Sequence, residues 1–239
     1  MDFFIYIIAA GIVFVWSMIV QTRLKSNVAR GSRIRAASGI TANEVVEQML
    51  REHDIMGITI EHKPGQMTDC YSPKEGKIYL SDTTYGQDTI AAIAIAAHEC
   101  GHAVQDHENM ALYEFRQLLA PFAGISSRVG PWLVIIGVVL SAYLERNGDT
   151  GFGWTLSTIG IVVYFVAFLF YLVMLPVERN ASSRAYKDMK QAGWVSDDQL
   201  SLAHKVLRSA GDTYAVALAS SAVTLIRLLA LRGGRRGRR

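Results

Sequence analysis

The sequence predicts an α-helical integral membrane protein that also carries a small α+β domain. Two observations predict the membrane part. Residues 3–20 and 152–177 contain no charged side chain, and each run is close to or above the ~20 apolar residues that a helix needs to cross the hydrocarbon core. The third observation is a polar stretch between them, 23–117, in which helix and strand patterns alternate over short distances.

The apolar start of the chain, residues 1–22, is predicted to be an uncleaved transmembrane anchor. Asp2 precedes the apolar run and no small-x-small cleavage site follows it, unlike in a secretory signal peptide. Five basic residues come next, before any further acidic one: Arg23, Lys25, Arg30, Arg33 and Arg35. Because basic residues gather on the cytoplasmic side of a span, we expect the N-terminus outside and the following segment in the cytoplasm.

Residues 23–117 are predicted to form this cytoplasmic α+β segment. Thr41 and Glu44 have the spacing of a capping box, so a helix is expected to begin there and to end before the next strand. Residues 58–62 have the β-branched alternation of that strand. Both cysteines are expected to stay reduced in this compartment.

A short hairpin and a long helix follow within the same segment. Residues 69–81 contain a turn at Pro73–Gly76 and a returning strand at 77–80, which we expect to form an edge that can pair with an extended peptide. Asp88 or Thr89 then caps a helix rich in alanine, which lets neighbouring elements approach closely.

Residues 118–177 are predicted to contain two transmembrane helices joined by a short external loop. The first helix must accept Arg128 and two prolines, whereas the second is the uncharged run described above. The loop, 145–152, carries two acidic residues and one basic residue, which is typical of the external side.

Residues 178–212 are predicted to be a cytoplasmic helical segment, and 213–239 an apolar helix with a basic tail. The apolar part of the latter allows two interpretations, a fourth span or a helix that lies on the membrane surface or on the domain. Arg227 interrupts it, and crossing would place five arginines outside, against the charge rule. We expect the tail to bind anionic headgroups and not nucleic acid, because no aromatic residues are interleaved with it.

Residues 97–103 read AHECGHA, and the spacing of the two histidines indicates a metal site. On a helix, His98 and His102 lie one turn apart on one face, so their imidazoles can bind one Zn²⁺. Glu99, one step round the helix, can act as general base toward a metal-bound water. A pattern that fixes only His98, Glu99 and His102 can also occur by chance. Without a metal, however, two histidines on an alanine-rich helix face would be costly to bury. Cys100 is interpreted as a small buried side chain.

A catalytic zinc site keeps three protein ligands and one open position, and Glu178 is the candidate for the third ligand. We expect it to open a helix just after Pro176, with Ser182 and Ala185 as small neighbours on the same face. The alternative is a glutamate that complements the dipole at a helix N-terminus.

Four segments in this order resemble the YugP-like neutral zinc metallopeptidases of membranes. They are AAIAIAAHECGHAVQ, the upstream DCYSPKEGKIYLSDTTY, LPVERNAS and KVLRSAGDTYAVALA, and the resemblance extends over nearly the whole chain. It implies a zincin-like catalytic domain of the gluzincin type with one Zn²⁺ per chain. His98, His102 and Glu178 would then be the metal ligands and Glu99 the catalytic base.

The chain is also similar to the HtpX-like membrane proteases, which carry an aspartate four residues after the third ligand. Here that position is Ser182, so contacts that orient the ligand histidines are expected from Asn180, Ser182 or a residue elsewhere. Tyr214 is the candidate to stabilise the transition state, with His204 and Arg208 as alternatives. A tyrosine at the membrane interface would explain Tyr214 equally well.

The expected function is a membrane-bound zinc endopeptidase, a hydrolase of the multi-pass cytoplasmic membrane whose site faces the cytoplasm. Its substrates are expected to be polypeptides, namely membrane proteins or their tails, lying along the strand at 77–80. The alternative is a zinc-stabilised membrane scaffold or adaptor without turnover. A transporter is disfavoured because Arg128 is the only charged residue in the predicted spans.

Overall fold

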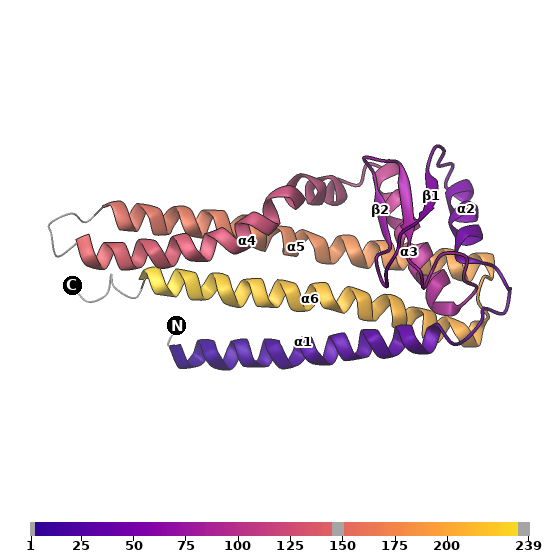
Figure 1. Ribbon diagram of the computed structural model, residues 1–239, viewed down its shortest axis with the longest axis horizontal. Coiled ribbons are helices and arrows are strands. Elements are labelled where there is room, and N and C mark those ends of the chain that lie inside the picture. The colour runs from indigo at the N-terminus through magenta and orange to yellow at the C-terminus, as the bar shows by residue number, and fades with distance from the viewer. Residues whose placement is uncertain (1–2, 145–150, 234–239) are drawn as a thin grey trace. The chain divides into compact units, whose positions relative to one another are not determined.

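The computed structural model describes residues 3–144 and 151–233, which are mostly helical (Figure 1). The elements in chain order are α1 (Phe3–Gly31), α2 (Ala42–Glu52), β1 (Thr59–His62), β2 (Cys70–Ser72), β3 (Lys77–Leu80), α3 (Ile90–His107), α4 (Ala111–Leu144), α5 (Phe152–Ala192) and α6 (Asp197–Gly233). They form two compact units. The first comprises the described residues within 1–17, 115–175 and 214–239, and the second comprises 18–114 and 176–213.

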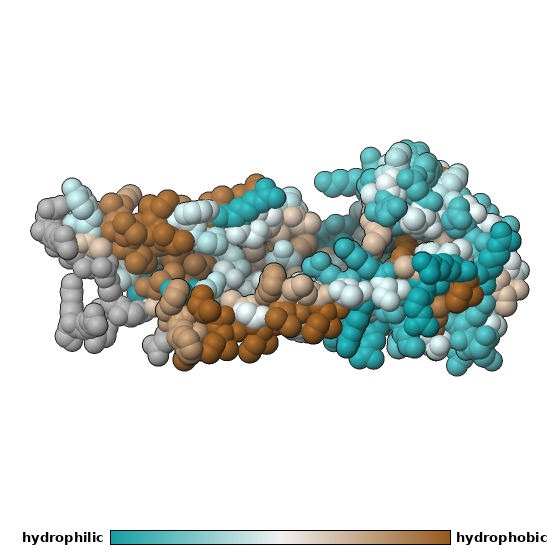
Figure 2. All heavy atoms as spheres, turned by 60° about the horizontal axis from the view of Figure 1, so that its bottom comes forward, coloured by the Kyte–Doolittle hydropathy of each residue, from teal (hydrophilic) through white to brown (hydrophobic). Residues whose placement is uncertain are grey.

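The first unit consists of apolar helical segments. Helices α1, α4, α5 and α6 are each long and apolar enough to cross a membrane. Large hydrophobic side chains such as Ile12 and Phe14 are exposed on α1, and Figure 2 shows hydrophobic residues gathered on the surface of the apolar segments. Such an exposed apolar surface suits a lipid environment.

Small residues bring α4 and α5 into close contact in this unit. A Cβ added at Gly137 would lie 2.5 Å from the backbone nitrogen of Ser157, and one added at Gly160 would lie 2.6 Å from that of Val134. Small residues at such positions are the usual means by which membrane helices pack, since lipid provides little hydrophobic force between them.

Arg227, which interrupts the apolar part of α6, lies over two aromatic rings of α1. Its guanidinium carbon is 5.4 Å from the centroid of Phe3 and 5.2 Å from that of Tyr6. These cation–π contacts offset part of the cost of a charged group in an apolar surrounding. By length and composition α6 is among the helices able to cross a membrane, and both interpretations given above stay predictions.

The second unit contains a small sheet with the strand order β1-β3-β2. Strand β2 pairs antiparallel with β3, with Tyr71 opposite Ile78, so the predicted hairpin is confirmed. Strand β1 pairs in parallel with β3, with Ile60 opposite Ile78. The prediction that strand 77–80 is an edge is therefore wrong, because β1 occupies its second side.

Two helices of this unit begin where the capping signals predicted. Thr41 and Glu44 form the complete capping box of α2. Thr89, and not Asp88, caps α3, since its side chain accepts a hydrogen bond from the backbone N–H of Ala92. Both helices pack into one core with β3 and the later parts of α5 and α6, through buried residues such as Val45, Ile93 and Val206.

Helices α5 and α6 run further than the sequence predicted. Helix α5 continues through Pro176, so the expectation that Glu178 opens a helix is wrong: this residue lies in the helix interior. Helix α6 is likewise unbroken across the expected boundary at residues 212 and 213. Proline in a helix interior removes one hydrogen bond of the helical ladder and crowds the carbonyl of residue i−4, but these effects did not suffice here to end the helix.

Candidate metal centre

Three side chains converge at one point of the second unit, two from α3 and one from α5. The Nε2 atom of His98 is 3.1 Å from Oε2 of Glu178, and Nε2 of His102 is 3.5 Å from Oε1 of the same carboxylate. One ligand atom from each residue lies within 4.8 Å of the others. Two imidazole nitrogens and a carboxylate oxygen are a donor set that suits Zn²⁺ with a further position left open.

The regular geometry of α3 places the two histidines. Being one turn apart, their rings lie 4.8 Å apart between centroids, at 79° to each other. Gly101, between them, allows α5 to approach, because a Cβ at this position would lie 2.8 Å from the carbonyl oxygen of Ala181. Because Gly101 has no side chain, α3 and α5 can approach closely enough for the two histidines to contact Glu178.

Glu178 is buried and is held in its charged form. Burial by itself would raise the pKa of this carboxyl group, but hydrogen bonds with the rings of His102 and His98 outweigh it and hold the pKa well below its usual range. A metal-binding carboxylate must be deprotonated, so this environment suits a ligand. The alternative of a glutamate complementing a helix dipole does not apply, since the residue lies far from the start of α5.

The Nδ1 atom of His102 is held by a buried glutamine. Gln105 Oε1 lies 2.9 Å from Nδ1, while Gln105 Nε2 donates to the carbonyl of Val177 at 2.8 Å and to Oδ1 of Asn180 at 2.9 Å. Those two acceptors determine the orientation of the amide, so its oxygen faces the imidazole and Nδ1 carries the proton. A metal would take the Nε2 lone pair of His102 in place of the proton that this nitrogen donates to Glu178.

Ser182 and Asn180 also contact the ring of a proposed ligand histidine or the glutamine that holds one. Oγ of Ser182 lies 3.2 Å from Nδ1 of His98, whose Nε2 faces Glu178. Asn180 does not reach a histidine but receives Gln105, and its Oδ1 also accepts a hydrogen bond from Nε of Arg184. Both residues proposed to orient the histidines thus lie where they can do so, one directly and one through Gln105.

Glu99 lies beside the ligand cluster but outside it. Its Oε2 accepts a hydrogen bond of 3.0 Å from the backbone N–H of Tyr71 on β2. The hydroxyl of Tyr71 donates to Asp106 at 2.8 Å, and burial is the largest of the effects that raise its pKa. Tyr71 thereby holds β2 against α3 through both its backbone N–H and its hydroxyl group.

The remaining candidates are distributed differently. Cys100 is fully buried, and burial raises the pKa of its thiol, so it is a neutral core residue. Tyr214 is half-buried on α6 and belongs to the first unit, so its assignment stays a prediction. His204 and Arg208 line a cavity together with Ser182.

Sequence reasoning missed Gln105 and Tyr71. Gln105 follows His102 by three residues, so its place on the same helix face was a usable signal. Nothing in the local sequence indicates the contact of Tyr71, which depends on how the sheet meets α3.

Comparison with known proteins shows the family to which this chain belongs. A family described as "Putative neutral zinc metallopeptidase" matches residues 6–233. The chain is 32% identical over 226 residues to "Putative membrane protease YugP" of Bacillus subtilis strain 168. The aligned residues cover 95% of this chain and 94% of that protein. No solved structure matches.

Fold, site and comparison together define the class of this protein. The four apolar helices and the membrane-protease relative identify a membrane protein, and the donor set fits zinc. The chain belongs to the family of neutral zinc metallopeptidases, as its resemblance in sequence predicted, and family membership indicates a protease.

Proposed function

We propose that this protein is a membrane-bound endopeptidase that uses one Zn²⁺ held by His98, His102 and Glu178. The observation that carries the proposal is the convergence of these three side chains, with Glu99 beside them and outside the cluster. Zinc bound there would lower the pKa of a coordinated water and polarise a peptide carbonyl.

Glu99 is assigned the role of general base. The backbone N–H of Tyr71 holds one carboxylate oxygen and so orients the group. In the part of the chain that the structure describes, its Oε1 accepts no hydrogen bond and remains available for a proton. Glu99 would take that proton from the attacking water and pass it to the leaving amine, as a positioned base does in general acid–base catalysis.

The substrate is proposed to lie beside β2. This strand is the edge of the sheet that faces α3, and the N–H of Tyr71 is directed to Glu99 and not to β3. Because Glu99 holds that N–H, an extended peptide would pair with this edge through its other backbone groups. Membrane proteins and their tails are the substrates proposed, since the site belongs to a membrane protein.

The site is proposed to face the cytoplasm. The five basic residues that follow the first apolar run support this orientation, because such residues gather on the cytoplasmic side.

The Glu99→Gln variant of the full chain tests the mechanism. It should keep about one zinc per chain and lose proteolysis of casein or a membrane-protein substrate by at least 10²-fold, since loss of a general base typically costs 10²–10⁴ in rate. Metal analysis and cleavage are measured on the same preparation. Undiminished cleavage by this variant would refute the assignment.

A scaffold stabilised by zinc is the second candidate, because the three donors tie α3 to α5 and a metal there would hold these helices together. In that case Glu99→Gln would retain every cellular function, whereas His98→Ala would destabilise the protein.

A further inference from the structure

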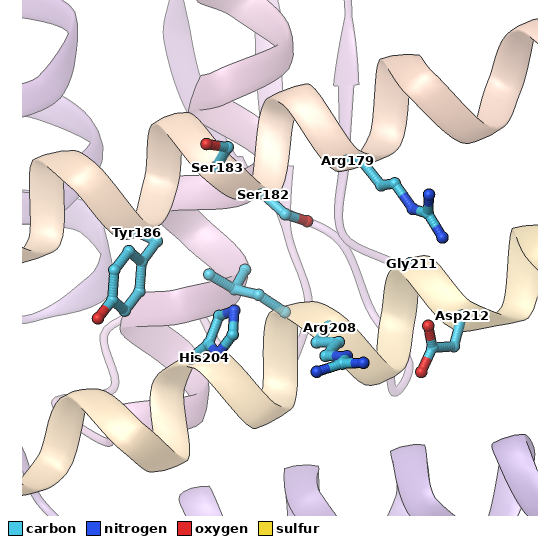
Figure 3. Close-up of a pocket in the computed structure, with 9 residues that line it drawn as sticks. Arg179, Ser182, Ser183, Tyr186, His204, Arg208, Gly211 and Asp212 are labelled. Carbon is cyan, nitrogen blue, oxygen red and sulfur yellow. The ribbon is translucent and has the colours of Figure 1, made fainter.

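A cavity of about 360 Å³ lies between α5 and α6 in the second unit (Figure 3). Helix α5 contributes Arg179, Ser182 and Tyr186 to its wall, at the spacing of one helix face. Helix α6 contributes His204, Arg208 and Asp212, again from one face. The cavity is thus formed by two facing helix surfaces, and the function proposed above assigns it no role.

The cavity adjoins the candidate metal centre. Ser182 lines the cavity and its Oγ lies 3.2 Å from Nδ1 of His98. Arg179 directly follows Glu178 in the chain. A group bound in the cavity would therefore lie one side chain away from a proposed metal ligand.

One end of the cavity is cationic. Figure 3 shows the guanidinium groups of Arg179 and Arg208 extending toward the end where Asp212 lies. Among the described residues neither Arg179 nor Arg208 forms an ion pair, whereas Arg184, on α5 like Arg179, holds both carboxylate oxygens of Glu108. Asp212 is the only acidic residue of the wall, so two guanidinium groups face one carboxylate.

The other end of the cavity is aromatic. The rings of Tyr186 and His204 lie 5.2 Å apart between centroids, and Leu207 adds an apolar surface beside them. A ligand that fills the space would have an apolar part and an anionic part. Arginine binds carboxylates well because its planar fork can donate two parallel hydrogen bonds.

We propose that this cavity is a substrate subsite that binds a carboxylate of the peptide near the cleaved bond, through Arg179 and Arg208. The proposal rests on the proposed function, since it assumes a peptide at the metal centre. The carboxylate can belong to a glutamate or aspartate side chain or to the C-terminus of the substrate, and the experiment separates these two sources.

Peptide binding to the full-length Glu99→Gln protein in detergent, loaded with zinc, tests the proposal without requiring turnover. The probes are short fluorescent alanine-leucine peptides, acetylated and amidated, with one glutamate at each position in turn and glutamine counterparts. A second set consists of the glutamine counterparts with a free C-terminal carboxylate in place of the amide. Either a glutamate at one position or the free C-terminus should bind on the order of tenfold more tightly than the matching uncharged peptide. Charge-assisted hydrogen bonds have an effect of this size.

Three variants give the direction of the effect. Arg208→Gln and Arg179→Gln should each remove most of the preference for the carboxylate, whereas Asp212→Asn should increase it, because a competing anion is removed. Lys187→Gln is the matched control: it removes one positive charge from an exposed position of α5 that does not line the cavity, and the preference should persist.

Equal affinity for all carboxylate and amide peptides would overturn the proposal, as would a preference that survives both arginine changes. If the arginine variants in detergent instead lose binding of a fluorescent phosphatidylglycerol while peptide preference is unchanged, the cavity binds a lipid headgroup and the assignment to peptide is wrong. These outcomes differ from failure of the proposed function, which would appear as absent cleavage by the unmodified protein.

Discussion

Single side chains decide whether the candidate site can hold a metal, and Gln105 is the clearest case. It is fully buried, and its amide joins His102 on α3 to Val177 and Asn180 on α5. A neutral glutamine that both accepts and donates is suited to this place, because a carboxylate there would have no proton for its two acceptors on α5.

We expect Gln105→Ala to weaken zinc binding about 10–100-fold, since residues that orient metal-binding histidines usually contribute that much. Stability should fall as well, by about 1–3 kcal/mol, because buried polar groups lose their partner. Competition with a fluorescent chelator measures the affinity, and denaturant unfolding measures the stability.

The matched control is Gln48→Ala. Gln48 accepts a hydrogen bond of 2.7 Å from the indole of Trp194, which is not a proposed metal ligand. This variant should lose stability and keep its zinc affinity. Equal zinc affinity in the Gln105 variant and the unmodified protein would contradict the role assigned to Gln105.

At the scale of elements, the contact between α3 and α5 makes the site. The histidines follow from the helical repeat of α3 alone, but Glu178 meets them only because α5 continues beyond Pro176 and passes Gly101 closely. Close packing of this kind tolerates little added volume.

Gly101→Ala should therefore be destabilising, by about 1–3 kcal/mol, because its Cβ would meet the carbonyl oxygen of Ala181 at 2.8 Å. Zinc affinity should also fall, since the two helices must separate. Gly124→Ala in α4 is the control, because a Cβ there has no atom within 4 Å, and it should be neutral or slightly stabilising. Similar melting temperatures for the two variants would speak against the close contact.

At the scale of the whole molecule, the number of spans sets the side on which each terminus lies. If α1, α4, α5 and α6 all cross the membrane, both termini lie on one side and the polar unit on the other. This arrangement places the arginines of the tail opposite the basic residues that follow the first anchor, so the positive-inside rule gives conflicting signals in this chain.

Reporter fusions resolve this conflict. If all four helices cross and the site lies in the cytoplasm, the C-terminus is external. Alkaline phosphatase fused after residue 239 should then be active, and a fluorescent protein fused at the same place should be dark. Fusions made after Gly193, between α5 and α6, should give the opposite result. A fluorescent C-terminal fusion together with an external N-terminus would mean that α6 does not cross the membrane.

Features that depend on neighbours within a few residues could be predicted from the amino-acid sequence. Apolar runs predicted the long helices, Thr41 and Glu44 predicted the start of α2, and the spacing of His98 and His102 placed both on one helix face. Each of these rests on the helical repeat, on capping or on transfer of apolar side chains from water, all of which act locally.

Contacts between groups far apart in the chain could not be predicted in this way and are seen in the folded structure. His98 and Glu178 are 80 positions apart, Gln105 and Val177 are 72 apart, and Tyr71 and Glu99 are 28 apart. Local patterns also did not predict the parallel pairing of β1 with β3, which makes β3 the central strand and leaves β1 and β2 as the edges. Such contacts depend on how helices and strands pack, and the absent side chain of Gly101 has its effect only because the carbonyl of Ala181 lies opposite it.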